Sequence, residues 1–195
     1  MGRHKSMPIV ISMLRGVNVG RHNRVKMDDL RALYASLKLH DVRTYVQSGN
    51  VLFRTPQGGE FGDLSTRIED AIERKFKFRP TVILRTASEL REVIARNPFA
   101  KRHALDPAKL LILFLAHDPA REAREQLLQI KTAPEELHIS GREVFIYYPD
   151  GLARPLLSWT QIEKVLQTRA TGRNWNSVLK MLVLAESLES ASASG

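Results

Sequence analysis

Two stretches of the chain show the same order of hydrophobic and polar patterns. Residues 9–85 predict strand, helix, strand, strand, helix, strand, and residues 110–167 predict strand, helix, strand, strand, helix. Short β-rich runs at Ile9–Leu14 and Leu110–Leu115 open the two copies. The second copy is expected to lack a final strand and to carry a helix, from about Asn174 to Leu188, in its place. A duplicated βαββα order predicts an α+β protein with two tandem ferredoxin-like subdomains, antiparallel sheets and an extra C-terminal helix.

Turn signals mark the centre of each copy and the boundary between them. Both predicted hairpins turn on Ser-Gly, at Gln47–Asn50 and at Ile139–Arg142. A polar, basic stretch bracketed by prolines, Pro98–Pro107, separates the copies. We therefore expect a first subdomain over residues 7–97, a linker over 98–108, and a second subdomain with the C-terminal helix over 109–189.

The predicted strands are apolar on both faces. In the first strand, Ile9, Ile11 and Met13 alternate with Val10 and Leu14. A ferredoxin-like sheet covers one face with its own helices, so a second cover is needed. Three alternatives could provide this cover: the two sheets pack on each other, the C-terminal helix packs on a sheet, or another subunit forms a homodimer through a sheet face.

Composition narrows the class of protein. The chain has 195 residues, 43% of them hydrophobic, so it predicts a globular protein. It contains no cysteine, which excludes disulfides, thiolate metal sites and Cys nucleophiles and fits a cytoplasmic location. No apolar run approaches the length of a membrane span, so no membrane association is expected. The histidines show no metal-binding spacing, and neither a metal nor a cofactor is predicted.

The formal net charge of +9 favours anionic partners, either a phosphorylated small molecule or nucleic acid. A merely soluble basic protein is the competing interpretation, because the charge is spread along the chain.

The loop at residues 15–26 is the first candidate site. It joins a predicted strand to a helix and holds two glycines, two asparagines, four Lys or Arg residues and no carboxylate. Such a loop beside a helix N-terminus is suited to anion binding. The alternative is a solvated connection whose glycines supply positive φ and whose asparagines form turns. The candidate residues are Arg15, Asn18, Gly20, Asn23 and Lys26.

The first hairpin turn supplies the second candidate group, Gln47, Ser48 and Asn50. The alternative is an ordinary hairpin turn. We expect this turn to lie at the opposite end of the sheet from the loop at residues 15–26, so that the two do not share a site within one subdomain.

Thr171–Ser177 supplies the third group, Arg173, Asn174 and Asn176, at the start of the last helix. Trp175 is expected in the core, on one stripe with Val178, Leu179 and Leu182. Arg173 is expected to point to solvent or into a pocket.

At these motifs the chain resembles a bacterial family, the domain of unknown function number 1697. The resembling segments are Arg15–Gly20, Lys26–Leu30, Val42–Val51 and Thr171–Val178. The resemblance implies two tandem ferredoxin-like subdomains, and it implies no known activity. The chain departs from the family pattern at two places. One is Arg21. The other is Arg154–Leu157, where family members often have Ser-Lys-Leu, so a role for that lysine does not carry over to this chain.

The hypothesis drawn from the sequence is an uncharacterised cytoplasmic bacterial protein that binds an anionic ligand through the basic, Gly- and Asn-rich loop. Two alternatives stay open. One is an enzyme without a recognised catalytic triad, in which Arg and Asn side chains stabilise negative charge. The other is a homo-oligomeric interaction module that uses a sheet face.

Overall fold

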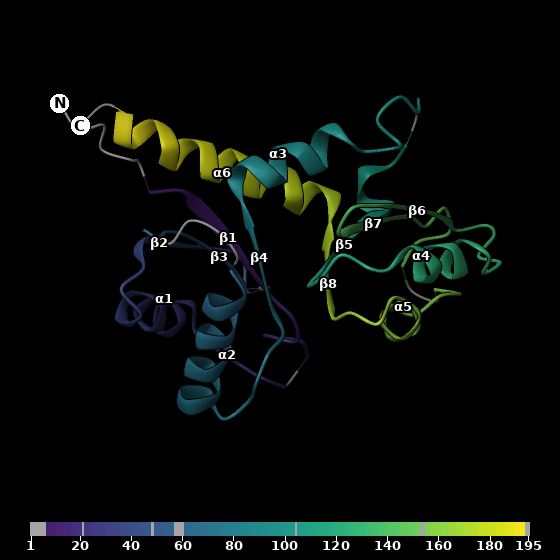
Figure 1. The fold of residues 1–195 in the computed structure, drawn as a ribbon. Helices are drawn as coiled ribbons and strands as arrows, with labels where there is room; N and C mark the ends of the chain where they lie inside the picture. The colour runs from purple at the N-terminus through teal and green to yellow at the C-terminus, as the bar shows by residue number, and fades with distance from the viewer. Residues whose placement is uncertain are drawn as a thin grey trace. The chain divides into compact units, whose positions relative to one another are not determined.

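The computed structural model describes residues 7–20, 22–47, 49–56, 61–103, 105–152 and 155–193. The chain forms two compact units, unit 1 with residues Met1–Arg91 and Met181–Gly195, and unit 2 with residues Glu92–Lys180 (Figure 1). Each unit contains one four-stranded antiparallel sheet with helices. The predicted α+β fold with two antiparallel sheets and a C-terminal helix is confirmed.

Unit 1 contains a complete βαββαβ pattern. Its sheet has the strand order β2-β3-β1-β4, with β1 and β3 in the middle. Helices α1 and α2 pack on one face of this sheet. The elements are β1 (Ile9–Leu14), α1 (Met27–Ser36), β2 (His40–Tyr45), β3 (Asn50–Arg54), α2 (Gly62–Phe76), β4 (Val82–Thr86) and α3 (Ala87–Ala95), whose end belongs to unit 2.

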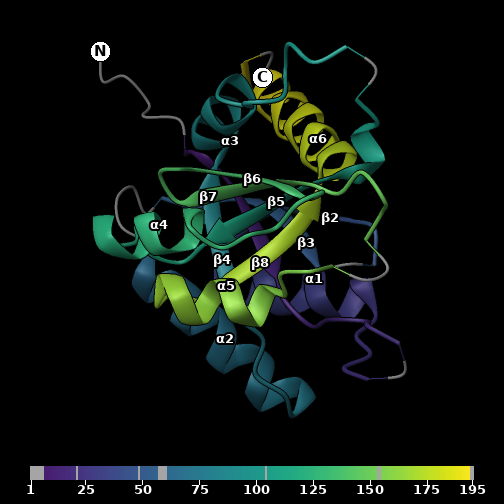
Figure 2. The same ribbon diagram turned by 90° about the vertical axis from the view of Figure 1, so that its right-hand side faces the viewer.

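Unit 2 repeats the pattern with the strand order β6-β7-β5-β8, and α4 and α5 pack on the same face of its sheet (Figure 2). The elements are η1 (Pro107–Lys109), β5 (Leu110–Leu115), α4 (Arg121–Leu128), β6 (Glu136–Ser140), β7 (Glu143–Tyr147), α5 (Trp159–Leu166), β8 (Ala170–Asn174) and α6 (Trp175–Ala193), of which the residues from Met181 onward belong to unit 1.

The prediction that the second copy lacks a final strand is wrong. Residues 170–174 form β8, which pairs with β5 in the same way as β4 pairs with β1. The sequence Ala-Thr-Gly-Arg-Asn has no β-rich apolar run, and its pairing comes from the neighbouring strand rather than from local propensity. Only after this strand does the chain turn into α6.

Alternation along the strands places one set of side chains under the helices. In unit 1 the helix-facing core includes Val10, Leu14, Val51 and Phe53. Tyr34 of α1 completes it, and its hydroxyl lies 2.8 Å from the Ser12 Oγ atom. Burial raises the pKa of Tyr34 above its ordinary value. The phenol therefore stays neutral and bonded inside the core.

The strands are buried on both faces, as their apolar pattern predicts. Ile9, Val10 and Ile11 are at most 2% exposed, and Leu111, Leu113 and Leu115 at most 5%. On the second face of the unit 1 sheet, the Arg54 guanidinium donates to the Leu188 carbonyl of α6. Because these residues are already buried in the single chain, their burial does not by itself require a second copy. The sheet-face homodimer stays a prediction.

Helix α6 differs from its predicted form in length, register and unit. The helix extends to Ala193, and its residues from Met181 onward belong to unit 1 rather than to the second half of the chain. Its buried stripe is Val178, Met181, Ala185 and Leu188, whereas Leu179 is 38% exposed and Trp175 is half-buried. The residues of this buried stripe are three, four and three positions apart, a spacing that fits one face of a helix as well as the predicted stripe does. The packing of the helix, which the sequence pattern does not give, determines which of the two stripes is buried.

Candidate functional site

The loop between β1 and α1 is built around the side chain of Asn18. Its Nδ2 donates to the Val25 carbonyl (3.1 Å), and its Oδ1 accepts from the Val25 N–H (2.8 Å). The second asparagine, Asn23, donates from Nδ2 to the Gly16 carbonyl (2.9 Å). Both asparagines have left-handed backbones, with φ of 55° and 50°. The two side chains therefore hold the loop together, as the turn interpretation predicts.

The same asparagine joins the loop to the β2–β3 turn. Asn18 Nδ2 also donates to the Gln47 carbonyl (2.8 Å), and the Leu14 N–H donates to the Gly49 carbonyl (2.9 Å). The expectation that the turn lies at the opposite end of the sheet is wrong. Since β3 runs antiparallel to β1, with Met13 opposite Asn50, β3 begins where β1 ends. Two of the predicted motifs thus meet at one end of unit 1.

Exposed basic side chains lie in this loop. His22, Arg24 and Lys26 are exposed, and within the described part of the chain their side chains form no hydrogen bond or ion pair. Arg15 is half-buried, and its N–H donates to the Thr81 carbonyl (2.9 Å). We call the exposed residues Val19, His22, Arg24, Lys26, Val46 and Gln47 the cationic loop surface.

The N-terminus of α1 limits how an anion would bind here. Lys26 is the N-cap residue and forms no side-chain cap, while Asp28 and Asp29 occupy the first turn. Asp28 pairs with Arg31. Two carboxylates in the first turn already use the favourable end of the helix dipole. An anion at this surface would therefore depend on the loop cations and loop amides rather than on the helix terminus.

Of the other predicted residues of this region that the structure describes, one is buried and one is exposed. Asn50 is fully buried and donates to the Tyr45 carbonyl at 3.4 Å. Ser48 lies outside the described residues. Gly20 is exposed with φ of 58°, and space around it is open. Asn50 is therefore removed from the candidate site, whereas Gly20 keeps its place in the loop.

Two exposed valines flank the junction and were not among the predicted site residues. Val19 is 64% exposed and Val46 is 52% exposed. Val46 also has φ of 48°, a left-handed conformation that β-branched residues rarely adopt. Apolar periodicity and turn propensity give no signal for such a residue, because both describe the conformations that a residue type favours.

The C-terminal motif lies in unit 2 and does not present an open arginine. Arg173 is on β8, is 7% exposed, and donates to Thr171 Oγ1 (2.9 Å) and the Gly172 carbonyl (2.7 Å). Burial lowers the pKa of Arg173 to about 10, so the group is still protonated at neutral pH. The expectation that it points to solvent or into a pocket is wrong. Strand pairing, which places Arg173 beside the central strand β5, is the reason.

Asn174 and Asn176 have different roles. Asn174 caps α6, since its Oδ1 accepts from the Asn176 N–H (3.0 Å), and its Nδ2 donates to the Ala108 carbonyl (2.7 Å). Asn176 is exposed. Asn174 therefore has a structural role at the start of the helix.

A repeat-related arginine was missed by the sequence analysis. Arg85 on β4 lies opposite Ile11, and Arg173 on β8 lies opposite Ile112, at the same position of the two sheets. Arg85 is 1% exposed. Aligning the two halves by strand register, rather than by the Ser-Gly turns, would have shown this pair. The Ser-Gly turns give a wrong alignment of the two halves because they differ in length. Four residues separate the paired residues Tyr45 and Asn50 in the first turn, and two separate Ser140 and Glu143 in the second.

The corresponding end of unit 2 is organised differently. The Ala116 N–H donates to the Arg169 carbonyl (2.9 Å), as Arg15 does to Thr81 in unit 1. Here a cavity of about 280 Å³ includes His117 and Thr168, and the Thr168 hydroxyl accepts from the His117 N–H (3.1 Å).

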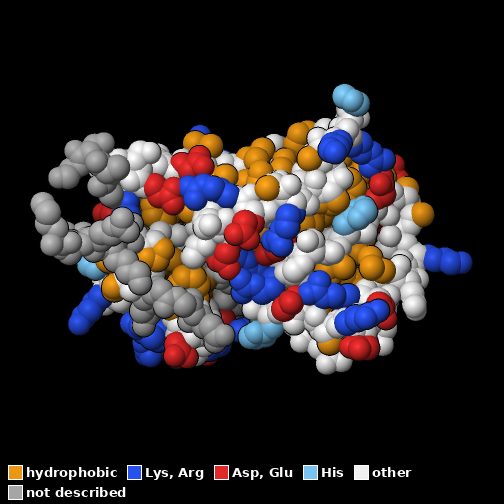
Figure 3. Space-filling view, turned by 45° about the horizontal axis from the view of Figure 1, so that its top comes forward, with side chains coloured by type: hydrophobic (Ala, Val, Ile, Leu, Met, Phe, Trp, Pro, Cys, Tyr) orange, Lys and Arg blue, Asp and Glu red, His pale blue; other side chains and the backbone are white. Residues whose placement is uncertain are grey.

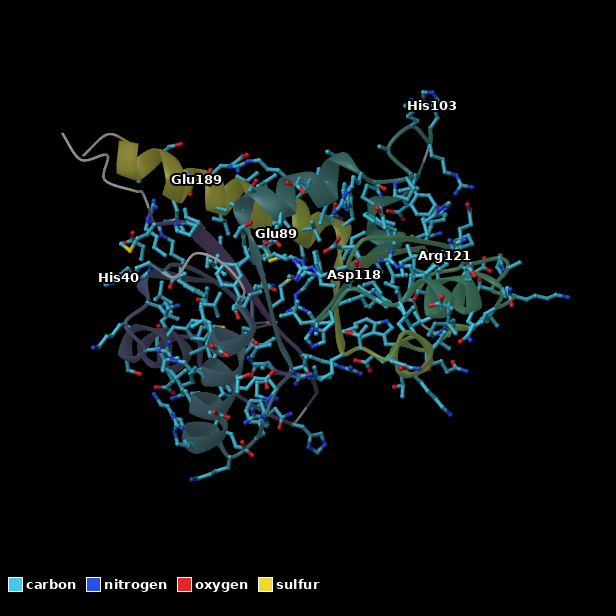
Figure 4. The ribbon with its side chains drawn as sticks, viewed as in Figure 1. His40, Glu89, His103, Asp118, Arg121 and Glu189 are labelled. Atoms are coloured by element: carbon cyan, nitrogen blue, oxygen red, sulfur yellow. The ribbon has the colours of Figure 1, made fainter. Side chains whose placement is uncertain are left out.

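The cations beside this cavity are paired. Figure 4 labels Asp118 and Arg121 beside α4. Arg121 pairs with Glu125 (2.8 Å), and Arg124 pairs with Asp118. The two repeats therefore differ in charge pairing at the same end of the sheet.

The described residues contain no group of three or more His, Asp or Glu side chains that could hold a metal ion. Across the same residues, no helix is both long and apolar enough to span a membrane.

Comparison with known proteins extends these observations. Residues 7–145 match the family described as "Protein of unknown function (DUF1697)". Among solved structures, the chain is similar to the conserved bacterial protein SP0830 from Streptococcus pneumoniae, with a TM-score of 0.72 and 18% sequence identity over 92% of this chain and 99% of that chain. At this identity the likeness supports the fold alone. No curated protein matches the chain.

Proposed function

The chain belongs to the DUF1697 family of proteins of unknown function, and we propose from its geometry that it binds a phosphate-bearing anion at the cationic loop surface of unit 1. Arg24 and Lys26 supply the charge, with Arg15 behind them. Asn18 and Asn23 position the loop and do not contact the ligand.

One observation carries this proposal: Arg24 and Lys26 are exposed, and their side chains form no hydrogen bond or ion pair among the described residues. In the repeat-related place of unit 2, Arg121 and Arg124 are neutralised by carboxylates of the same region. Unpaired cations that gather on a loop without carboxylates raise the local concentration of anions. The fold does not need this arrangement, because unit 2 forms the same sheet without it.

The backbone of the loop supports the same conclusion. Gly16, Asn18, Gly20 and Asn23 have φ values of 78°, 55°, 58° and 50°. Backbones that enter the left-handed region repeatedly are the kind that form anion-binding concavities of N–H groups. Gly20 contributes most, because it is exposed and carries no side chain that could block a ligand.

The surface favours phosphate groups over nucleic-acid bases. Its members include no Phe, Tyr or Trp, so a single-stranded nucleic acid would find none of these rings on which to stack. Phosphate is the chemistry shared by a phosphorylated small molecule and a nucleic acid. The absence of cysteine supports the cytoplasmic location that we also propose.

Charge-neutralising variants test the proposal. We expect Arg24→Gln and Lys26→Gln to weaken binding of labelled inorganic polyphosphate and of a labelled single-stranded oligonucleotide, and to reduce the salt dependence of log Kd by about 1 for each cation. Lys164→Gln on α5, an exposed lysine of unit 2, is the matched control. Melting temperatures should stay unchanged for all three variants.

The two probes separate the sources of phosphate. Binding of both probes, lost together in the loop variants, supports recognition of phosphate groups. An equal loss of affinity in Lys164→Gln, or unchanged affinity in the loop variants, would contradict a site at this loop.

A further inference from the structure

A second feature of unit 1 is a groove between α1 and α2. Figure 1 shows the two helices next to each other under the unit 1 sheet. The groove has a volume of about 510 Å³, within the range of small-molecule sites. Its apolar lining comes from both helices. Ala32 and Leu33 lie on α1, Leu37 directly follows α1, and Ala71 lies on α2.

Small residues create this hollow. Leu33 and Ala71 are buried at 4% and 8% exposure, while Ala32 is exposed on the rim. Leucine-sized side chains at the two alanine positions would fill the space between the helices. The groove opens to solvent, so a ligand can reach its apolar floor from the surface.

Three of the four carboxylates of α2 pair with one arginine. The Arg79 guanidinium pairs with Glu69 (3.2 Å), Asp70 (2.5 Å) and Glu73 (2.9 Å). The hydrogen bonds that Arg79 donates to Asp70 and Glu73 raise the pKa of Arg79. These three carboxylates therefore do not neutralise the basic residues that follow on the helix.

The rim of the groove is cationic for this reason. Arg74 is exposed and has no hydrogen bond or ion pair within the described residues. Lys75 makes one hydrogen bond, to the Asp29 carbonyl (3.3 Å), and its Nζ lies 5.4 Å from the centre of the Phe76 ring. The described residues that line the groove include no carboxylate. Arg67, seven residues before Arg74, lies on the same side of α2.

We propose that this groove binds a small anionic amphiphile, a molecule with an apolar chain or ring and a single carboxylate, sulfonate or phosphate group. The apolar part lies on Leu33, Leu37 and Ala71, and the anion contacts Arg74 and Lys75. A helix of a protein partner is a poorer fit, because it needs an apolar strip several turns long. This inference goes beyond the proposed function and does not rest on it, since none of these residues belongs to the cationic loop surface.

Anilinonaphthalene sulfonate and laurate are suitable probes, since each combines an apolar group with one anion. We expect the folded protein to bind the sulfonate saturably, and laurate to displace it while inorganic phosphate does not. Arg74→Gln should weaken both affinities about tenfold, the scale of one lost charged hydrogen bond. Ala32→Phe fills the groove from the exposed rim and should block binding without disturbing the core.

Two control variants isolate the groove. Arg43→Gln changes an exposed arginine on β2 that has no partner among the described residues, and should leave both affinities unchanged. Arg24→Gln should also leave them unchanged, which separates the groove from the loop site. Unchanged dye binding in both Arg74→Gln and Ala32→Phe, at unchanged melting temperature, would overturn the proposal. So would displacement of the dye by phosphate.

Discussion

At the scale of single residues, side chains that the sequence predicts to bind a ligand instead stabilise the loop in which they lie. Asn18 is the clearest case, because its amide makes three hydrogen bonds to Val25 and Gln47. Its residue type and position suggested a polar site, and both are equally typical of a turn. The distinction needs the partner atoms, which come from a turn 29 residues away in sequence.

Loss of the Asn18 amide should destabilise the protein. We expect Asn18→Gly to lower the free energy of unfolding by about 1–3 kcal/mol, because the partly buried N–H and carbonyl of Val25 and the carbonyl of Gln47 lose their partner. Asn18→Ala should cost up to about 1 kcal/mol more, since alanine adopts a positive φ less readily than glycine. Urea unfolding of the two variants measures both steps. Equal stability of wild type and Asn18→Gly would contradict the structural role.

Strain at Val46 gives a stabilising substitution. Asparagine tolerates the left-handed backbone that valine resists, so Val46→Asn should raise the free energy of unfolding by about 0.5–1 kcal/mol. Val19→Asn is the matched control, because Val19 is an exposed loop valine without a positive φ. Thermal melts compare the two. A loss of stability in Val46→Asn would mean that the valine side chain makes contacts that outweigh its strain.

At the scale of elements, the sequence pattern predicted the strongly apolar strands and failed on the weakly apolar one. Ile9–Leu14 and Leu110–Leu115 match β1 and β5 residue for residue. β8 was missed because its side chains are small or polar, and its glycine packs against an aromatic ring instead of presenting a side chain. The end of the sheet at which the β2–β3 turn lies was also predicted wrongly. The antiparallel direction of β1 and β3 alone determines this end.

Gly172 is the residue that fits β8 against α5. A Cβ atom added there would lie 2.4 Å from Cη2 and 2.5 Å from Cζ2 of Trp159. Gly172→Ala should therefore lower the free energy of unfolding by about 1–3 kcal/mol, the usual cost of overpacking. Trp159→Leu should relieve the clash, so the double variant should lose less than the sum of the single losses. Additive losses, measured by urea unfolding, would show that the ring moves away without cost.

At the scale of the whole molecule, charge is partly paired and partly free. Figure 3 shows acidic and basic side chains next to one another on one face. In unit 1, Arg91 of α3 pairs with Glu186 (3.2 Å) and Glu189 of α6, which ties the C-terminal helix to the first unit. The net charge of +9 was readable from the sequence, whereas the location of the unpaired cations required the ion-pair geometry. The sequence therefore indicates that a ligand would be negatively charged, and the structure indicates where on the molecule it would bind.

The most direct test of anion binding at the cationic loop surface is a nuclear magnetic resonance titration of isotope-labelled protein with inorganic polyphosphate. The largest amide shift changes should fall in residues 15–26 and around the β2–β3 turn, and they should disappear in the Arg24→Gln, Lys26→Gln double variant. Largest changes at the α1–α2 groove, in unit 2, or spread evenly over all exposed lysines and arginines would contradict the account.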